Sequence, residues 1–272
     1  MIKILTAHSG QGGSTTAHIN LCNLLNRNSI DCELYGPHLW HHGKCHSRSI
    51  EEYRSHPTDN LIVHLIRLIR RPSCHRLVYS SHEFSRIFPL RESHPSLYDA
   101  IQYVSQAQRE ELDVRHPNER IITNVLDPIR PVPKSFQRVA GIIGAIEPPK
   151  QVHLSIDRAL DDGMELIHLF GGINDQAYFD QEIRPRMDHN PGKIIFHGFI
   201  EDKQSIYEHV TDVYHSSQYE TWGYIAAECR LAKVTYHGNH ATKNRIIMSD
   251  EEILNAWKDL FEIDQSKPAV HA

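Results

Sequence analysis

Short apolar runs alternate with amphipathic segments along most of the chain, which is the pattern of strands and helices in an α/β protein. Apolar residues recur at helical spacing after residue 17 and again in the last third of the chain, where Ser249 precedes three acidic residues as a predicted N-cap. Ser105 is a second predicted N-cap. Buried strands are predicted at residues 2–7, 32–36, 61–65, 77–81, 139–144, 166–172, 193–199, 213–215 and 233–238, and helices at 17–25, 178–186, 203–209, 225–232 and 249–263.

The composition is that of a globular protein whose two halves differ in charge. Of 272 residues, 40% are hydrophobic and 23% charged, and the net charge is −5. Residues 1–133 hold 15 Lys and Arg against 13 Asp and Glu, and residues 134–272 hold 14 against 21, so the halves carry +2 and −7. This difference predicts two units. The sequence has no long basic stripe with interleaved aromatic residues, which argues against nucleic acid as a partner.

Three features predict a cytoplasmic location. No apolar run reaches the length of a membrane span, and residues 1–10 lack a signal-peptide pattern. The cysteines number five and are scattered, which favours free thiols in a reducing compartment.

A glycine-rich segment, residues 8–16, joins the first predicted strand to the first predicted helix. Strand, glycine-rich loop and helix form an arrangement that cradles phosphate groups. Gly12 and Gly13 precede two threonines, as in the deviant phosphate loop of ParA-type ATPases, and the segment also resembles the opening of GT4 glycosyltransferases. The ATPase interpretation requires a lysine for the phosphates, and this segment has none, which favours the transferase.

The segment 216–228 combines a loop, a helix start and two carboxylates. Thr221, Trp222 and Gly223 are predicted to be the first helical residues, whose free N–H groups and positive dipole end would bind an anion. Glu220 lies ahead of these donors and Glu228 lies about a turn and a half into the helix, so the two carboxylates could contact opposite ends of one elongated ligand. The alternative is a capped helix whose first-turn glutamate complements the dipole.

Residues 220–228 resemble the E-x7-E signature of the retaining GT-B glycosyltransferases, most closely the GT4 family, and other segments match that family in the same order. The resemblance covers most of residues 1–262, although both halves are shorter than is usual. It implies an α/β protein of the GT-B fold, with two Rossmann-like domains whose parallel sheets face each other across a cleft. The implied boundaries are residues 1–133 for the acceptor-side domain, 134–264 for the nucleotide-sugar domain and 265–272 for a flexible tail.

The same resemblance implies roles for individual residues. Glu220 would bind the hydroxyls of the transferred sugar, Glu228 the ribose, and His82 the sugar near the reacting carbon, so that Glu220 and His82 act catalytically by positioning and electrostatics. Lys150 would stabilise the departing diphosphate, but Ala145 stands where the family has an arginine. The residues implied to contact the donor are Gly12, Gly13, Lys150, Thr221, Trp222, Gly223 and Glu228.

The implied activity is metal-independent transfer of a hexose from a nucleotide-diphosphate sugar, with retention of anomeric configuration, to a saccharide or glycolipid acceptor in polysaccharide biosynthesis. No cofactor is expected. A catalytically weakened nucleotide-sugar binding protein is the first alternative, and a P-loop-like nucleotide hydrolase is the second.

Two further segments leave alternatives open. Residues 66–76 carry four arginines among leucine and isoleucine, which suits either contact with an anionic membrane surface or a phosphorylated acceptor, or a helix packed on the sheet with its arginines in water. Residues 38–46 include four histidines and a cysteine, which are the usual zinc ligands, but their spacing matches no metal motif and favours an exposed or acceptor-facing loop.

Overall fold

A computed structural model describes the chain except for residues 9–11, 38–42, 134–136, 239–244 and 264–272. The chain forms two compact units. Unit 1 comprises Met1–Asp127 and Ile246–Ala272, and unit 2 comprises Pro128–Arg245. The predicted tail 265–272 and most of the histidine-rich segment lie outside the described residues.

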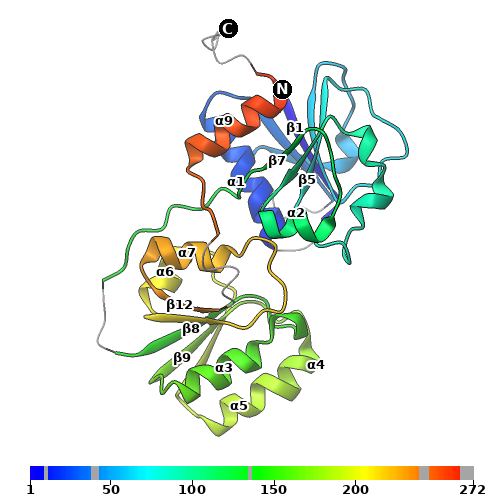
Figure 1. Cartoon of the computed structure of the whole chain (residues 1–272). Coiled ribbons are helices and arrows are strands. Elements are labelled where there is room, and N and C mark those ends of the chain that lie inside the picture. The colour runs from blue at the N-terminus through cyan, green and yellow to red at the C-terminus, as the bar shows by residue number, and fades with distance from the viewer. Residues whose placement is uncertain (9–11, 38–42, 134–136, 239–244, 264–272) are drawn as a thin grey trace. The chain divides into compact units, whose positions relative to one another are not determined.

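Unit 1 is built on a seven-stranded parallel sheet in the order β3-β2-β1-β4-β5-β6-β7 (Figure 1). Its strands are β1 (Ile2–Thr6), β2 (Cys32–Gly36), β3 (Ser47–Ser49), β4 (Asn60–His64), β5 (Arg76–Ser81), β6 (Ala100–Tyr103) and β7 (Glu119–Ile121). The central strands are buried along nearly their whole length, as in parallel sheets covered on both faces. The strand order reverses between β1 and β4, and open α/β sheets bind their ligands beyond the carboxyl ends of the strands at such a point.

Three helices among the described residues of unit 1 cover this sheet, and the caps predicted for two of them are confirmed. They are α1 (Gly13–Arg27), α2 (Gln106–Leu112) and α9 (Asp250–Phe261). The Ser105 side chain accepts a hydrogen bond from the Gln108 amide, and Ser249 and Glu252 form a capping box at the start of α9.

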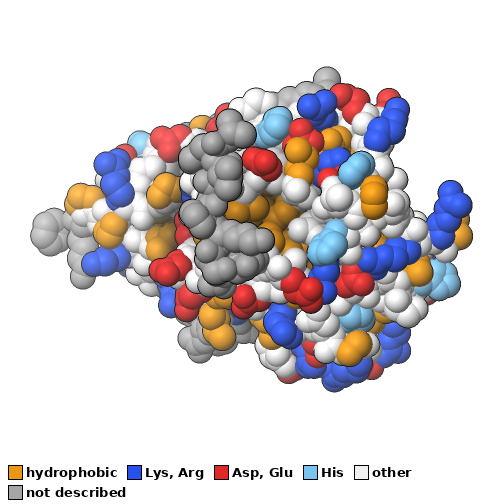
Figure 2. All heavy atoms as spheres, turned by 90° about the horizontal axis from the view of Figure 1, so that it is seen from above, with side chains coloured by type: hydrophobic (Ala, Val, Ile, Leu, Met, Phe, Trp, Pro, Cys, Tyr) orange, Lys and Arg blue, Asp and Glu red, His pale blue; other side chains and the backbone are white. Residues whose placement is uncertain are grey.

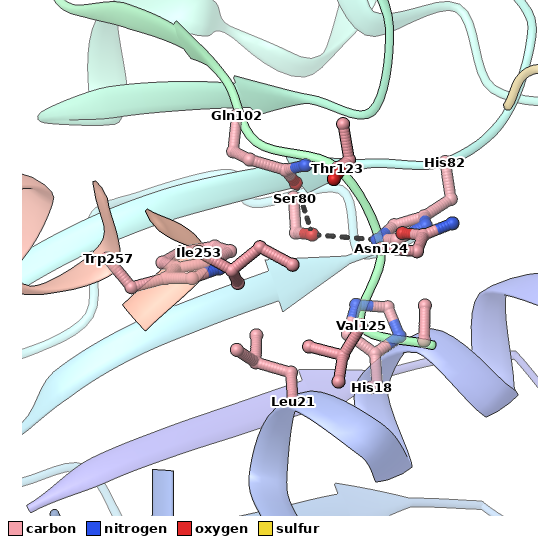
Figure 3. Close-up of a pocket in the computed structure, with 11 residues that line it drawn as sticks. His18, Leu21, Ser80, His82, Gln102, Thr123, Asn124, Val125, Ile253 and Trp257 are labelled. Atoms are coloured by element: carbon pink, nitrogen blue, oxygen red, sulfur yellow. Dashed lines mark hydrogen bonds between the residues drawn. The ribbon is translucent and has the colours of Figure 1, made fainter. Parts of the chain in front are cut away.

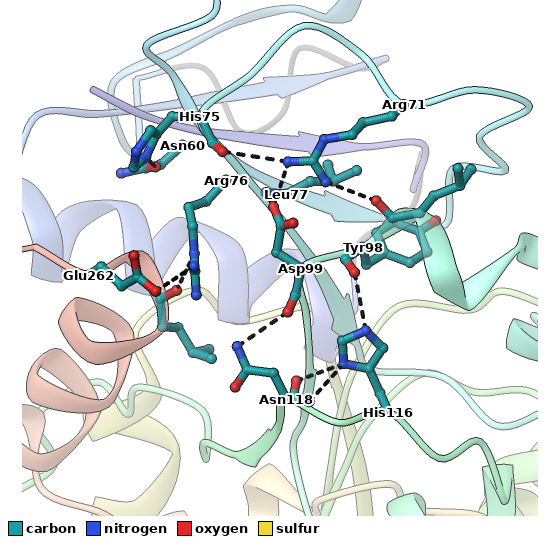
Figure 4. A network of polar contacts seen from close by, with 12 residues as sticks. Asn60, Arg71, His75, Arg76, Leu77, Tyr98, Asp99, His116, Asn118 and Glu262 are labelled. Carbon is teal, nitrogen blue, oxygen red and sulfur yellow. Dashed lines mark hydrogen bonds and ion pairs between the residues drawn. The ribbon is translucent and has the colours of Figure 1, made fainter.

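The helix α9 belongs to unit 1, whereas the sequence placed it in the second domain. Its apolar face, including Trp257 and Phe261, packs into the core formed by α1 and strands β1 and β2, and Figure 1 shows α9 beside α1. Beyond it, the guanidinium of Arg76 on β5 donates to the carbonyl of Leu260 at 3.0 Å and to the Glu262 carboxylate at 2.6 Å (Figure 4). The predicted range 134–264 is therefore wrong at its carboxyl end.

The boundary between the units also lies earlier than predicted. Pro128 begins unit 2, and the amide of Val132 donates to the carbonyl of Ala232 at 2.9 Å. The amide of Arg130 donates to the Gln204 side chain at 2.8 Å. Because these bonds fix residues 128–133 to unit 2, the proline-rich stretch is part of that unit rather than the end of the first.

The basic segment 66–76 is an irregular loop rather than a helix. Leu65 at its start takes a left-handed backbone conformation with φ 57°, which lies outside the extended region, so β4 ends before it. Arg71 then donates to the Asp99 carboxylate at 2.6 Å and to the Leu97 carbonyl at 2.9 Å. Figure 4 shows this network, in which Asp99 also accepts from the amide of Leu77 on β5.

Unit 2 is built on a five-stranded parallel sheet in the order β10-β9-β8-β11-β12. Its strands are β8 (Val139–Ile143), β9 (Leu166–Phe170), β10 (Ile194–Gly198), β11 (Asp212–His215) and β12 (Thr235–Gly238). Its helices are α3 (Val152–Asp161), α4 (Gln176–Tyr178), α5 (Arg184–His189), α6 (Lys203–Glu208) and α7 (Tyr224–Ala232). The predicted helix 178–186 is divided by a π-helical turn, Phe179–Ile183, between α4 and α5.

The predicted α/β class with two Rossmann-like units of parallel strands is confirmed. Among the described residues, no helix is both long and apolar enough to cross a membrane. On the face shown in Figure 2, acidic, basic and hydrophobic side chains are interspersed.

Candidate active site

The turn between β11 and α7 contains most of the predicted donor-binding residues. Gly223 has φ 86° and ψ 70° and forms the N-cap, so α7 begins at Tyr224. The prediction that Thr221, Trp222 and Gly223 are the first helical residues is therefore wrong, because the left-handed conformation of Gly223 lies outside the helical region. The first-turn amides, which have no acceptor within the helix, therefore follow this glycine instead of including it.

Glu220 lies at the centre of a small charged cluster before this helix. Its Oε1 atom is 2.8 Å from Lys150 Nζ and 3.0 Å from His215 Nε2. Burial alone opposes ionisation of Glu220, but the hydrogen bond to His215 and the charge of Lys150 outweigh it and lower the pKa of Glu220 to about 2. The carboxylate is therefore fully ionised at neutral pH.

The structure brings Lys150 to Glu220 by linking two loops of the same sheet. Lys150 ends the short helical turn Pro148–Lys150 after β8. The carbonyl of Pro149 accepts a hydrogen bond from the Gln218 amide at 3.0 Å, and the hydroxyls of Ser155 and Ser216 are 3.0 Å apart. Strands β8 and β11 are paired in the sheet, so their carboxyl-terminal loops meet at one edge.

Glu228 is buried on α7, with only 3% of its surface exposed. One of its oxygens is 2.6 Å from Lys203 Nζ, and the other accepts a hydrogen bond from the Tyr207 hydroxyl at 2.8 Å. Both partners come from α6. Because each carboxylate oxygen has two lone pairs, Glu228 keeps acceptor capacity for a further donor such as a ribose hydroxyl.

Trp222 is a packing residue of this turn. Its side chain is 3% exposed, and its ring meets the ring of Tyr224 edge to face, with 5.1 Å between centroids. The indole therefore holds the turn in place, while the predicted contact of Thr221, Trp222 and Gly223 with the donor concerns their backbone and stays a prediction.

In unit 1, the described part of the glycine-rich loop is Gly12 and Gly13. Gly12 is the N-cap of α1 in an extended conformation, and Gly13 is the first residue of the helix. A Cβ atom at Gly12 would lie 3.5 Å from Nε2 of His8, which is an ordinary contact. The geometry at Gly12 therefore does not itself require glycine, and the predicted role of this pair stays a prediction.

His82 follows β5, and its ring lies inside unit 1 at 8% exposure. Its Nε2 atom is 3.0 Å from the Ser80 hydroxyl, which donates to Gln102 Oε1 at 2.7 Å. In Figure 3, His82 and His18 border a pocket together with Ile253 and Trp257 of α9. The cavity of about 10 Å³ is close to the space that one water molecule needs.

Three buried histidines form a cluster that the sequence did not predict. The ring of His18 on α1 lies 4.7 Å from that of His64 and 4.6 Å from that of His82, and the rings of His64 and His82 are 5.3 Å apart. Burial lowers the pKa of each, that of His82 to about 3. All three are therefore neutral at pH 7, and His82 would meet a sugar as a neutral hydrogen-bonding group.

Glu83 is the carboxylate next to this cluster. Its Oε1 atom lies 3.8 Å from Nε2 of His64, while Nδ1 of His64 is 2.9 Å from the Thr6 hydroxyl. Burial of Glu83 raises its pKa, but the neighbouring histidines, His64 first, outweigh burial and leave the pKa lowered. Adjacency to His82 was the one signal in the sequence, and only the fold places His64 and His18 beside it.

The described residues contain no group of three or more histidine, cysteine or acidic side chains arranged to hold a metal ion. The expectation that no metal is required stays a prediction.

The two units of parallel strands define the fold of the GT-B glycosyltransferases. The chain is similar to Alr3699/HepE of Anabaena, solved with UDP and glucose, with a TM-score of 0.67 and 14% identity over 96% of this chain and 90% of that one. It is similar to TarM (TM-score 0.70, 11% identity, 96% and 98% covered). It is also similar to WaaG, a glycosyltransferase involved in lipopolysaccharide biosynthesis, with a TM-score of 0.60 and 11% identity over 96% of this chain and 90% of that one. No protein-family model and no curated protein matches the sequence significantly.

Proposed function

We propose that this protein transfers a hexose from a nucleotide-diphosphate sugar to a saccharide or glycolipid acceptor, with retention of anomeric configuration and without a metal. The observation that carries the proposal is the ionised Glu220 held by Lys150 and His215 ahead of the first turn of α7, on a GT-B fold. Positive groups and free amides at this position suit a leaving diphosphate, and an anionic acceptor of hydrogen bonds suits sugar hydroxyls.

The donor is proposed to bind unit 2. UDP is the first candidate nucleotide, because the similar HepE structure was solved with UDP and glucose and a TarM structure was solved with UDP. Unit 1 is proposed to serve the acceptor side, with His82 and Glu83 at the carboxyl edge of its sheet. Incubation with radiolabelled UDP-glucose, UDP-galactose and UDP-N-acetylglucosamine, together with a panel of lipid and saccharide acceptors, tests the proposal by transfer of label.

Ala145 favours one alternative, a nucleotide-sugar binding protein with weakened catalysis. Its methyl group replaces the cation that the resemblance leads us to expect in the loop after β8. Binding of a nucleotide sugar without any transfer or hydrolysis, over hours and with excess enzyme, would support this alternative against the transferase.

Glu228 is expected to contribute to nucleotide affinity. The Glu228→Gln variant keeps the shape of the side chain but loses the charge that accepts ribose hydroxyls, and we expect the nucleoside diphosphate to bind about tenfold more weakly. Tyr207→Phe removes one hydrogen bond to Glu228 while leaving the carboxylate, and should change affinity much less. Isothermal titration calorimetry measures both, and equal affinities for wild type and Glu228→Gln would remove the ribose role.

We further propose that unit 1 contacts an anionic bilayer through the loop after β4. Ile69 at its tip is 93% exposed, between Arg67 and Arg70, while Leu68 packs inward against the core. The second loop of this edge, after β5, exposes Ile87 beside Arg86. Arg67, Arg70 and Arg86 stand next to or near these two exposed isoleucines, whereas Arg71 and Arg76 are paired with Asp99 and Glu262. Arginines around an exposed apolar tip suit an anionic lipid surface.

Co-sedimentation with vesicles tests the bilayer contact. Wild type should sediment with phosphatidylglycerol vesicles and not with phosphatidylcholine vesicles. Arg70→Gln should reduce the partition constant about fivefold, and Ile69→Ser about tenfold. The controls Arg120→Gln and Leu154→Ser remove an exposed arginine and an exposed leucine elsewhere. Binding that is unchanged in Arg70→Gln and Ile69→Ser, or equally reduced in the controls, would contradict this contact.

A further inference from the structure

The loop after β8 offers less positive charge than the proposed reaction needs. Residues 144–150 contain Lys150 as their one basic residue, and Ala145 stands where the resemblance leads us to expect an arginine. A departing nucleoside diphosphate develops negative charge, and an enzyme stabilises it with cations and N–H groups already in place. We therefore looked for a second cation elsewhere in unit 2 that approaches Lys150 and Glu220.

Arg245 is the last residue of unit 2, and its side chain reaches the turn between β11 and α7 that contains Glu220. Its Nη2 atom donates a hydrogen bond to the backbone carbonyl of Glu220 at 2.8 Å. Lys150 approaches the side chain of the same residue, with its Nζ atom 2.8 Å from Oε1. Arg245 lies 25 positions after Glu220 in the sequence, and Lys150 lies 70 positions before it. The fold thus brings two cations from distant segments to Glu220.

The position of Arg245 is fixed by its backbone as well as by its side chain. The carbonyl of Arg245 accepts a hydrogen bond from Arg230 Nη1, in the last turn of α7, at 2.9 Å. The guanidinium is half-buried, and a planar fork of donors held in one orientation is well suited to bind phosphate oxygens in pairs.

Two cations contact Glu220, Lys150 at its side chain and Arg245 at its backbone carbonyl. Lys150 and Arg245 contribute two positive charges against the single negative charge of Glu220, while the charge of Glu228 is matched separately by Lys203 at 2.6 Å. Burial lowers the pKa of Arg245, and the nearby Glu220 charge only partly offsets this. Burial of a cation also strengthens its attraction for an anion that reaches it, because the surroundings screen the charges less than water does.

We propose that Arg245, together with Lys150, binds the diphosphate of the donor and supplies the positive charge that Ala145 does not. This inference rests on the proposed function. In the transfer, the bond between the anomeric carbon and the diphosphate oxygen breaks and its electron pair stays with the diphosphate. The acceptor oxygen bonds to the anomeric carbon and its proton is released. Arg245 neutralises the charge that collects on the leaving group.

Calorimetric titration with a nucleoside, its monophosphate and its diphosphate tests this role, with the uridine, guanosine and adenosine series as probes. Arg245→Gln retains a donor for the Glu220 carbonyl but loses the charge. We expect it to bind the diphosphate at least tenfold more weakly while binding the nucleoside within twofold of wild type. Arg245→Lys should recover part of the loss. Arg184→Gln, which removes an exposed arginine of α5 paired with Asp180, is the matched control.

The outcomes separate this inference from the proposed function. If wild type binds a diphosphate and Arg245→Gln binds it equally well, the role of Arg245 is wrong and the proposed function stands. If Arg245→Gln loses nucleoside, monophosphate and diphosphate affinity to the same extent, Arg245 only holds the turn in shape. If wild type binds no nucleoside diphosphate, the proposed function falls and this role with it.

Discussion

Replacing Glu220 by glutamine is expected to lower the rate of sugar transfer about a hundredfold or more, while the affinity for the nucleoside diphosphate changes by less than about threefold. The substitution keeps the size of the side chain and removes the charge. Glu220 is proposed to act on the sugar, and its carboxylate contacts Lys150 and His215 rather than the nucleotide-binding helix α7 itself. Lys150, which is proposed to bind the diphosphate, keeps its own charge when Glu220 is neutral, so the loss should be larger in turnover than in nucleotide binding.

Single-turnover measurements with enzyme in excess separate chemistry from product release. Glu165→Gln, which neutralises an exposed carboxylate before β9, is the control and should retain full activity. A Glu220→Gln protein with wild-type turnover would exclude the sugar-contact role. A Glu220→Gln protein that lost turnover and nucleotide affinity to the same extent would indicate that Glu220 mainly holds Lys150 in position.

The second large effect is expected on stability: unit 1 should lose stability as the pH falls from 7 to 5. In the folded protein, burial lowers the pKa of His18, His64 and His82 below the ordinary histidine value of about 6.5. Below pH 6.5 the unfolded chain therefore binds protons that the folded chain does not, so the free energy of unfolding decreases with falling pH. Each fully shifted histidine contributes about 2 kcal/mol over the interval from pH 6.5 to 5.

The neighbouring titratable groups do not reverse this decrease in the free energy of unfolding. His8 lies near the cluster and lowers the same pKa values, while Glu83 raises that of His64 without overcoming burial. Hydrogen exchange followed by mass spectrometry, on peptides covering β1 and β4, measures the stability of unit 1 separately. His56→Gln, at an exposed position, should keep the full pH dependence, and His18→Leu should reduce it. Exchange protection that is equal at pH 7 and pH 5 would contradict the assignment of three neutral histidines.

Local patterns predicted the parts of this fold that local interactions determine. The apolar runs that became β1, β4 and β5 and the capping pattern at Ser249 could be recognised in the sequence because each depends on residues close together in the chain. The Glu220 and Glu228 pair could be recognised because its fixed spacing resembles a family signature. The structure brings Lys150 to Glu220, and the roles of these residues toward a donor stay predictions.

Other features depend on contacts between distant segments, which no local pattern contains. The helix α9 has an apolar face that could pack on either unit, and only its packing against α1 assigns it to unit 1. The start of α7 was misplaced because Gly223 takes a left-handed conformation that a helix cannot include. Arg245 was missed because its neighbours in sequence give no indication that its guanidinium returns to Glu220.

The central claim, that the protein binds a nucleotide-diphosphate sugar, is tested most directly by thermal unfolding in the presence of nucleotides and nucleotide sugars, in one series with EDTA to remove metals and in a second with magnesium and no EDTA. A ligand that binds the folded state alone raises the unfolding temperature, and the rise grows with the logarithm of the ligand concentration once that concentration exceeds the Kd. We predict stabilisation by one nucleoside diphosphate and its sugar conjugates, and little by the nucleoside alone. Stabilisation only by ATP with magnesium, or by none of these ligands, would contradict the account.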